Sequence, residues 1–299
     1  MRESSTGPDV SACMKMPTST FEPDRASIWV RRLVRGDGFV VDDVHCTARR
    51  GTWSEPEHAS GYAFVLTRSG CFERRANGAE MLVDAALAYF RERGEEQQVA
   101  HPSDCGDRCT SIGLTPAIVA SLWGGDPSGL PAATFSTPTL DLAHRRLLAT
   151  CRGGASATDV EELVVNIVSA ALAQHSSPRL DSGRATSAAA RRRIVRDARQ
   201  LLADDPTHTL RELARQLAVS PHHLSRIFSA ATGTSLTAYR NRLRTRTALE
   251  RIADGERSLT RLAAELGFTD HAHLTRTIRS ETGLPPSAHR RNWGVADVK

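Results

Sequence analysis

The sequence lacks any apolar run long enough to cross a membrane. Its longest apolar stretch, VVNIVSAALA at 164–173, is short and is interrupted by Asn166, whereas a spanning helix needs about 20 mostly apolar residues. The first residues, MRESSTGPDVSACMKM, contain no apolar segment of the kind found in a secretory signal. We therefore expect neither a membrane partner nor a signal peptide.

Cysteine is sparse as well. The six cysteines are spread over 299 residues, at positions Cys13, Cys46, Cys71, Cys105, Cys109 and Cys151. Small secreted domains instead concentrate their cysteines in a short chain stapled by disulfides. The distribution favours a cytoplasmic protein with mostly free thiols.

Catalytic motifs are absent too. The chain has no GxSxG, HExxH or Walker A motif, and no GxGxxG in a strand-to-helix context. We assign no catalytic residue, no metal ligand and no cofactor, and we expect the protein not to be an enzyme.

What the sequence does contain is an uneven charge. Residues 184–299 hold 21 Lys and Arg against 11 Asp and Glu, a net charge of +10, and almost all the basic residues are arginine. Residues 1–183 carry −5, which leaves +5 for the whole chain. An acidic half joined to a strongly basic half is typical of a sensor or assembly domain attached to a polyanion-binding domain. Charge alone does not exclude an ordinary solvated surface.

The N-terminal half has the pattern of a β domain. Residues 1–25 are polar and predict a flexible tail. From about 27 to 115, short alternating or apolar runs are separated by turns rich in Gly, Asn and Pro, and Asn77-Gly78 indicates a tight hairpin. This spacing predicts a β-sandwich or small barrel.

Two helical patterns follow a Gly/Pro/Ser-rich connection at 124–139. The first covers 140–151, and the second begins at a capping box formed by Thr158 and Glu161. The second places apolar residues on one face at helical spacing, which favours either an intramolecular core or a dimerisation helix. These residues are Val160, Leu163, Val164, Ile167, Val168, Ala171 and Leu172.

The C-terminal half contains one unit twice, because LSRIFSAATGTSLTAYR at 224–240 is matched without gaps by LTRTIRSETGLPPSAHR at 274–290. In the first copy, Thr209 and Glu212 form a capping box for one helix, and Ser220 caps the next, which Gly233 ends. Two short helices separated by about three residues predict a helix-turn-helix.

The second copy repeats this construction from Leu259 onward. Gly267 replaces Ala218 in the turn, Thr269 is expected to cap the second helix, and one extra residue lies between the turn and Leu274. Between the copies, LTAYRNRLRTRTALERIAD predicts a helix that holds the two units apart. Recognition helices must lie about 34 Å apart to enter successive major grooves.

The predicted DNA-contacting residues are those left outside once the apolar face of each second helix is assigned. In the first copy they are His222, His223, Ser225 and Arg226, and in the second copy they are His271, Ala272, His273, Thr275 and Arg276. The N-terminal end of such a helix enters the major groove, where arginine reaches guanine or phosphate. Arg240 and Arg290, which close the two units, are expected to be structural or phosphate-facing rather than base-reading, and a structural role is favoured.

The region 191–292 resembles the DNA-binding domain of the AraC/XylS family of bacterial transcription regulators. The motifs that match are LARQLAVSPHHLSRIF, NRLRTRTALERI and LAAELGFTDHAHLTRTIRSETGLPPSAHR. The chain departs from the family at Thr245, where leucine is usual and packing is expected to be looser, and at Ala272, which lacks a polar side chain. The N-terminal half resembles the cupin-like regulatory domain that many members carry.

The resemblance implies a fold in the α+β class with two domains. We expect a flexible tail at 1–25, a cupin-like barrel with trailing helices that regulates and dimerises at 26–175, a linker at 176–190, an all-α double helix-turn-helix at 191–292, and a tail at 293–299. The partners expected are double-stranded promoter DNA, a second copy of the chain, RNA polymerase and a small-molecule effector.

An alternative function for the N-terminal half is that of a cupin-type metal-dependent enzyme or a redox or metal sensor. His101, Cys105 and Cys109 are evenly spaced, which suggests metal or thiol chemistry, with Cys105 and Cys109 as a redox- or metal-responsive pair. Pro102 and Gly106 argue against one helix presenting all three, and simple packing of the cysteines is favoured. The other candidate ligands, His45, Cys46, His58, Cys71, Asp104 and Asp107, are scattered.

Overall fold

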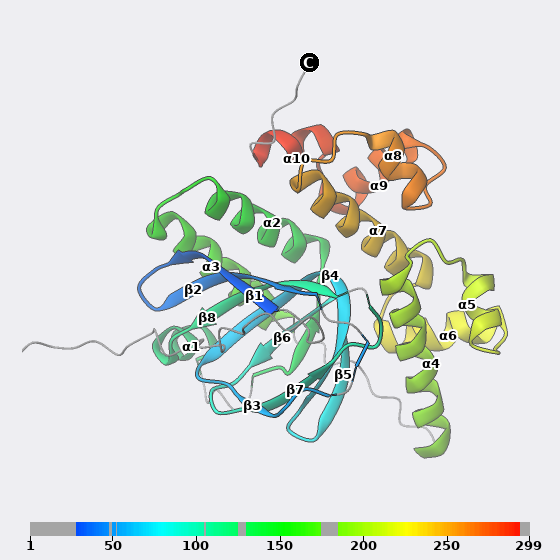
Figure 1. Cartoon of the computed structure of the whole chain (residues 1–299), viewed down its shortest axis with the longest axis horizontal. Helices are drawn as coiled ribbons and strands as arrows, with labels where there is room; N and C mark the ends of the chain where they lie inside the picture. Colours follow the sequence, from blue (N-terminus) through cyan, green and yellow to red (C-terminus); the bar gives the residue numbers. More distant parts are fainter. Residues whose placement is uncertain are drawn as a thin grey trace, which may run out of the picture.

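The computed structural model describes residues 28–47, 50–51, 53–104, 106–124, 130–174 and 185–293, the last range with side chains from 188. Its first part is rich in strands and ends in helices, and its second part is entirely helical (Figure 1). The predicted fold class is therefore confirmed. The predicted tail at 1–25 and most of the linker lie outside the described residues. Residues 185–190, which we assigned to the linker, belong to an alanine-rich helix.

One long strand organises the β-rich part. Strand β4 (Tyr62–Ala76) pairs with β8 and β6 along its first half and with β5 and β7 along its second half. Its register with β8 shifts between Thr67 and Ser69, and such a bulge bends a strand. The main path of the sheet is β1-β2-β8-β4-β6-β9. The other strands are β1 (Ile28–Arg35), β2 (Phe39–Cys46), β3 (Glu57–His58), β5 (Ala79–Asp84), β6 (Leu87–Arg91), β7 (Glu96–Ala100), β8 (Asp107–Leu114) and β9 (Ala133–Phe135).

Strand β4 is buried on both faces along its first half, which explains why it begins with a nearly continuous apolar run. Phe64 and Leu66 belong to the core that the helices cover, and Phe64 stacks on Phe90 with ring centroids 4.5 Å apart. Ala63 and Val65 belong to a second cluster on the opposite face. The predicted hairpin is confirmed, since β4 and β5 pair up to the turn at Asn77-Gly78. The sequence did not predict β9 or the short helix α1 (Pro116–Trp123).

Helices α2 (Pro138–Arg152) and α3 (Ala157–Ala173) cover one face of the sheet (Figure 1). The apolar stripe of α3 lies in the same core as the sheet, with Val160, Val164 and Ile167 fully buried. The stripe is therefore intramolecular core. The predicted capping box at Thr158 is wrong, because Ser156 caps the helix and exchanges hydrogen bonds with Asp159.

The helical part has two separate cores joined by one long helix. Helix α7 contributes Leu236, Tyr239 and Leu243 to the first core, and Ala248, Leu249 and Ile252 to the second. The first core also contains the side chains of α4, α5 and α6, and the second those of α8 and α9. The helices are α4 (Ala185–Asp204), α5 (Leu210–Gln216), α6 (Pro221–Thr232), α7 (Leu236–Ala253), α8 (Leu259–Glu265), α9 (His271–Thr282) and α10 (Pro286–Asn292).

A buried polar cluster joins the two parts of the molecule. Asp84, at the end of β5, is completely buried and accepts hydrogen bonds from Arg199 Nε of α4 (2.9 Å) and from the Tyr239 hydroxyl of α7. Arg199 Nη2 also donates to the Leu82 carbonyl at 3.0 Å. Helix α4 accordingly lies beside β5 (Figure 1).

A second junction connects α2 with α7. Arg246 Nε donates to Asp141 Oδ2 at 2.9 Å, and Arg145 Nη1 lies 3.2 Å from Glu250 Oε1. All four side chains are largely buried. The two ion pairs hold the helical part against the β-rich part.

Candidate nucleic-acid interface

The first helix pair has the predicted caps. Thr209 and Glu212 form a complete capping box on α5, and the Ser220 side chain accepts from the His223 amide at the start of α6. Pro221 occupies the first position of α6, where its missing N–H is not needed. Ala218 forms the turn between the helices with a φ of 54°. These local signals determine where α6, the candidate recognition helix, begins.

Helix α6 buries one side and exposes the predicted reading residues on the other. Leu224 and Phe228 are fully buried in the first core. His222 and Arg226 are exposed, and His223 and Ser225 are half-buried. No hydrogen bond or ion pair engages the Arg226 side chain within the described ranges.

Helix α9 presents the same pattern fifty residues later. Leu274 and Ile278 are fully buried, Arg276 and His271 are exposed, and Thr275 and Ala272 are half-buried. Both helices contain 12 residues. Arg276 therefore lies at the position in α9 that Arg226 has in α6.

The start of α9 differs from the prediction. Asp270 caps the helix by accepting from the His273 amide at 2.6 Å, so the assignment of this cap to Thr269 is wrong. The extra residue of the second copy lies in the turn before this cap, and it does not alter the helix itself. The His273 ring packs edge-on against Phe268 at 5.3 Å, and its Nδ1 accepts from the Thr269 amide at 3.4 Å. This ring is thus less free to face a ligand than that of His222.

Comparison with known proteins agrees with this geometry. The family model described as a helix-turn-helix domain matches residues 213–292. The chain is 30% identical over 84 residues to the HTH-type transcriptional regulator Rv1931c of Mycobacterium tuberculosis, and 34% identical over 96 residues to the bifunctional transcriptional activator/DNA repair enzyme Ada of Escherichia coli. Residues 213–292 form an AraC-type helix-turn-helix domain.

Both relatives match only part of the chain, over lengths close to that of the helix-turn-helix domain. The matches cover 28% and 32% of this chain, and only 32% of the Mycobacterium protein and 27% of Ada. Among solved structures, the unsaturated fatty acid-bound ToxT of Vibrio cholerae covers 88% of this chain and 99% of its own, at 13% identity and a TM-score of 0.35. The C-terminal domain of AraT from Geobacillus stearothermophilus covers 38% of this chain and 87% of its own, at 26% identity and a TM-score of 0.32.

Two arginines brace the helix-turn-helix domain at equivalent positions. Arg240 Nη1 donates to the His208 carbonyl at 3.2 Å, just ahead of α5. Arg290 Nη2 donates to the Glu256 and Arg257 carbonyls at 3.1 and 2.7 Å, just ahead of α8. The structural interpretation of both residues is confirmed.

The spacer between the two helix pairs is a continuous helix, as predicted. The 18 residues of α7 correspond to a length of about 27 Å at 1.5 Å per residue. This length is of the same order as the 34 Å between successive major-groove segments. Thr245 is buried within α7, and its hydroxyl has no hydrogen-bond partner among the residues described. The looser packing expected there stays a prediction.

Several arginines of α7 are not available to a ligand. Arg246 is almost fully buried against Asp141, and Arg244 donates to the carbonyls of Pro206 (2.7 Å) and Thr207 (3.2 Å). Burial and the neighbouring Arg240 lower the pKa of Arg244 to about 10, so it stays charged at neutral pH. The positive charge of this half therefore serves partly to hold the domains together.

The candidate ligands of the β-rich part fall into different places. His58 pairs with Glu96 at 3.5 Å on the surface, and Asp104 accepts from the Arg50 amide at 2.7 Å. Cys71 and Cys109 are buried, and Cys109 Sγ lies 3.2 Å from Asp107 Oδ2. Cys105 lies outside the described residues, so the hypothesis of a Cys105–Cys109 pair stays a prediction.

The structure does bring three of these candidates together: Cys46, His101 and Asp107. His101 Nε2 lies 2.8 Å from Asp107 Oδ1. Although burial disfavours a charged ring, the hydrogen bond to Asp107 raises the pKa of His101 to about 9. Sequence reasoning named the three residues but did not group them, because Cys46 comes from a strand far away in the chain.

A cavity of about 870 Å³ lies between the sheet and the helix-turn-helix domain. Met81, Leu82 and Phe135 line it from the sheet, and Arg199 and Arg226 line it from α4 and α6.

None of the described helices is long and apolar enough to cross a membrane.

Proposed function

We propose that this chain is a sequence-specific DNA-binding transcription regulator. The observation that carries the proposal is the equivalence of α6 and α9, which have equal lengths and bury matching apolar faces. Each leaves an arginine exposed at the same position, Arg226 or Arg276. Two such helices on a rigid spacer suit two adjacent major-groove segments. His222, His223, Ser225, His271, Ala272, His273 and Thr275 complete the proposed contact set.

The N-terminal half would regulate this binding. The cavity between the sheet and α6 is lined by apolar side chains and by arginines, including Arg226 itself. It is also lined by Glu73 and Glu80, whose charges are paired with Arg196 and Arg75. A small effector with an apolar body and an anionic group fits that lining, and it would contact both parts of the molecule at once. A second copy of the chain and RNA polymerase remain expected partners. The stripe of α3 is not proposed as the dimer surface, because it is already buried.

No enzymatic activity is proposed. Ada carries a DNA repair function in its name, but the match covers only 27% of Ada and 32% of this chain. The function that we propose is therefore recognition of DNA by a cytoplasmic protein.

The proposal is tested by binding-site selection with the full chain, followed by fluorescence anisotropy on the selected site and on random DNA. Arg226→Ala and Arg276→Ala should each cost about 1–3 kcal/mol on the selected site if they contact a base. Random DNA should lose much less. An equal loss on both DNAs would assign the arginine to a phosphate.

Arg93→Ala is the matched control, because Arg93 is an exposed arginine in the β-rich part. It removes the same charge and should leave both affinities unchanged. Selection that enriches no motif, together with binding that does not respond to salt, would refute the proposed function.

A further inference from the structure

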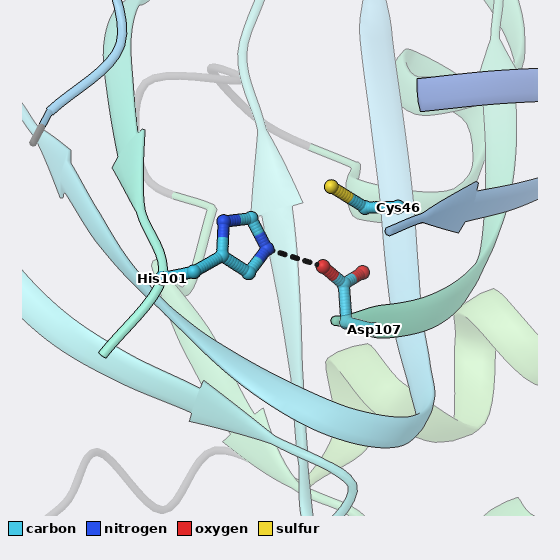
Figure 2. A group of neighbouring side chains, drawn as sticks. All are labelled: Cys46, His101 and Asp107. Carbon is cyan, nitrogen blue, oxygen red and sulfur yellow. Dashed lines mark hydrogen bonds and ion pairs between the residues drawn. The ribbon is translucent and has the colours of Figure 1, made fainter. Parts of the chain in front are cut away.

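Three metal-ligating side chains from three separate elements converge in the β-rich part. Cys46 is the last residue of β2, Asp107 is the first residue of β8, and His101 directly follows β7. One ligand atom of each lies within 4.8 Å of the others. Figure 2 shows the His101 ring directed at the Asp107 carboxylate, with the Cys46 sulfur beside them.

The fold positions these residues through backbone pairing rather than through mobile side chains. Cys46 and Asp107 are cross-strand partners in the antiparallel β2–β8 pair, so their side chains leave the sheet on the same face. Gly106 permits the close approach of the strands, because a Cβ at this position would lie 2.3 Å from the Cys46 carbonyl oxygen. The exposed fractions of Cys46, His101 and Asp107 are only 4%, 8% and 7%. The cluster is thus a fixed feature of the interior.

The donor set suits a borderline metal ion. A thiolate, an imidazole and a carboxylate are the three ligand types that Zn²⁺ takes, at bond lengths of about 2.0–2.3 Å. Tetrahedral bonds of that length place ligand atoms about 3–4 Å apart, close to the spread in this cluster. Magnesium and calcium prefer sites made of oxygen only.

Neighbouring groups orient the carboxylate for this role. Cys109 Sγ lies 3.2 Å from Asp107 Oδ2, which leaves Oδ1 as the oxygen that faces His101. Partners of this kind, behind the ligands themselves, typically orient metal-binding groups.

We propose that Cys46, His101 and Asp107 bind one divalent metal ion of the zinc class, with solvent as the remaining ligand. In the metal-bound state the ion replaces the proton between His101 Nε2 and Asp107 Oδ1, and Cys46 binds as thiolate. The sequence alone predicts no such site. A metal sensor is one of the alternative functions that the sequence suggests for the N-terminal half, from the spacing of His101, Cys105 and Cys109. The site in the structure shares only His101 with that set.

The location of the site gives it a route to the DNA-binding helices. Ser103, between two of the ligands, donates from Oγ to Asp204 Oδ1 at the end of α4 (2.6 Å). Arg108, next to Asp107, lies 2.5 Å from Asp254 at the end of α7. An ion that ties His101 to Asp107 restrains the segment from which both contacts come. This coupling, unlike the site, rests on the proposed function.

Cobalt titration of the reduced, chelator-stripped full chain tests the site without DNA. We expect one Co²⁺ per chain, a thiolate-to-cobalt charge-transfer band, and displacement of the cobalt by Zn²⁺. Cys46→Ala should abolish the band, and Asp107→Asn should weaken binding at least about 10-fold. Cys151→Ala is the matched control, because Cys151 is another buried free cysteine, in α2. It should leave the band intact.

Wild-type protein without a thiolate band would overturn the site, whether or not the variants fold. So would a full band in folded Cys46→Ala protein, since another cysteine would then supply the sulfur. Coupling is tested by anisotropy on the selected DNA site with and without Zn²⁺. A change in affinity of about 3-fold or more that Asp107→Asn removes supports it, and an unchanged affinity in metal-loaded wild type refutes it.

Discussion

Asp84 joins the β-rich part to two helices of the helical part, and replacing its carboxylate should destabilise the whole molecule. The side chain is completely buried. Its oxygens accept from Arg199 Nε and the amide of Ala86, both at 2.9 Å, and from the Tyr239 hydroxyl. Asp84→Asn keeps the shape but removes the negative charge. Arg199 would then be a nearly buried cation without its counterion.

The expected cost follows from that loss. Breaking a buried ion pair by removing one partner typically costs about 3–5 kcal/mol, because the remaining charge stays desolvated. The Asn oxygen and the Leu82 carbonyl, which also accepts from Arg199, compensate in part. We therefore expect about 3 kcal/mol. Glu80→Gln makes the same chemical change on the same strand, but Glu80 is 52% exposed, so its pair with Arg75 should contribute less than about 1 kcal/mol.

Urea unfolding followed by circular dichroism and by tryptophan fluorescence measures the difference. Coincident transitions for the two signals are required before a single free energy of unfolding is assigned. A double-mutant cycle adds Arg199→Gln, and the pair of substitutions should cost less than the sum of the single ones by more than about 1 kcal/mol. The reasoning fails if Asp84→Asn lies within about 1 kcal/mol of the wild type.

Three further predictions concern the helix-turn-helix domain. Ala218→Gly should stabilise the protein by about 0.5–1 kcal/mol, because a positive φ strains alanine, and Gly267→Ala, at a φ of 68°, should destabilise it by at least about 1 kcal/mol in thermal melts. Arg290→Ala should cost about 1–2 kcal/mol through two lost hydrogen bonds to carbonyls, whereas Arg291→Ala, at an exposed site, should cost less than about 0.5. Burial and a nearby arginine lower the pKa of His289 to about 4, so stability should fall by at most about 3 kcal/mol as the pH drops from 6.5 to 4, in urea titrations at several pH values.

The sign of the last effect follows from proton uptake. Between pH 4 and 6.5 the unfolded chain binds a proton at His289 that the folded chain does not, so stability rises with pH across this window. His289→Gln should flatten the profile there. A profile as steep as that of the wild type would assign the effect to other groups.

The effects of Ala218→Gly and Gly267→Ala on stability need not be equal in size, because a Cβ at Gly267 would also come within 2.9 Å of the Arg244 side chain. A stabilised Gly267→Ala variant would contradict the argument from φ.

The sequence predicted the helical part closely because its signals are local. Each signal acts on residues only a few positions away in the chain. The signals are a capping box at Thr209, a serine–proline start at Ser220 and a glycine stop at Gly233. The error at Thr269 came from the extra residue in the turn, since both Thr269 and Asp270 are good caps and only the geometry of the turn selects between them.

Features built from distant residues could not be read in the same way. The cluster of Cys46, His101 and Asp107 depends on the register of β2 with β8. The burial of several arginines of α7 likewise depends on partners such as Asp141, about a hundred residues earlier. Net charge therefore overstated the basic surface, because charge composition does not show which cations are already paired.

The repeat divides the helical part into two similar halves, but their cores are not equally self-contained. The core around α6 includes Ala85 and Ala86 from the turn between β5 and β6, and Phe135 of β9 packs against it. The core around α9 contains only residues of the helical part. A fragment that begins at α4 would therefore expose an apolar patch at its first helix pair and none of this origin at its second. The folding of the first helix pair therefore depends on contacts with the β-rich part as well as on contacts within the helical part.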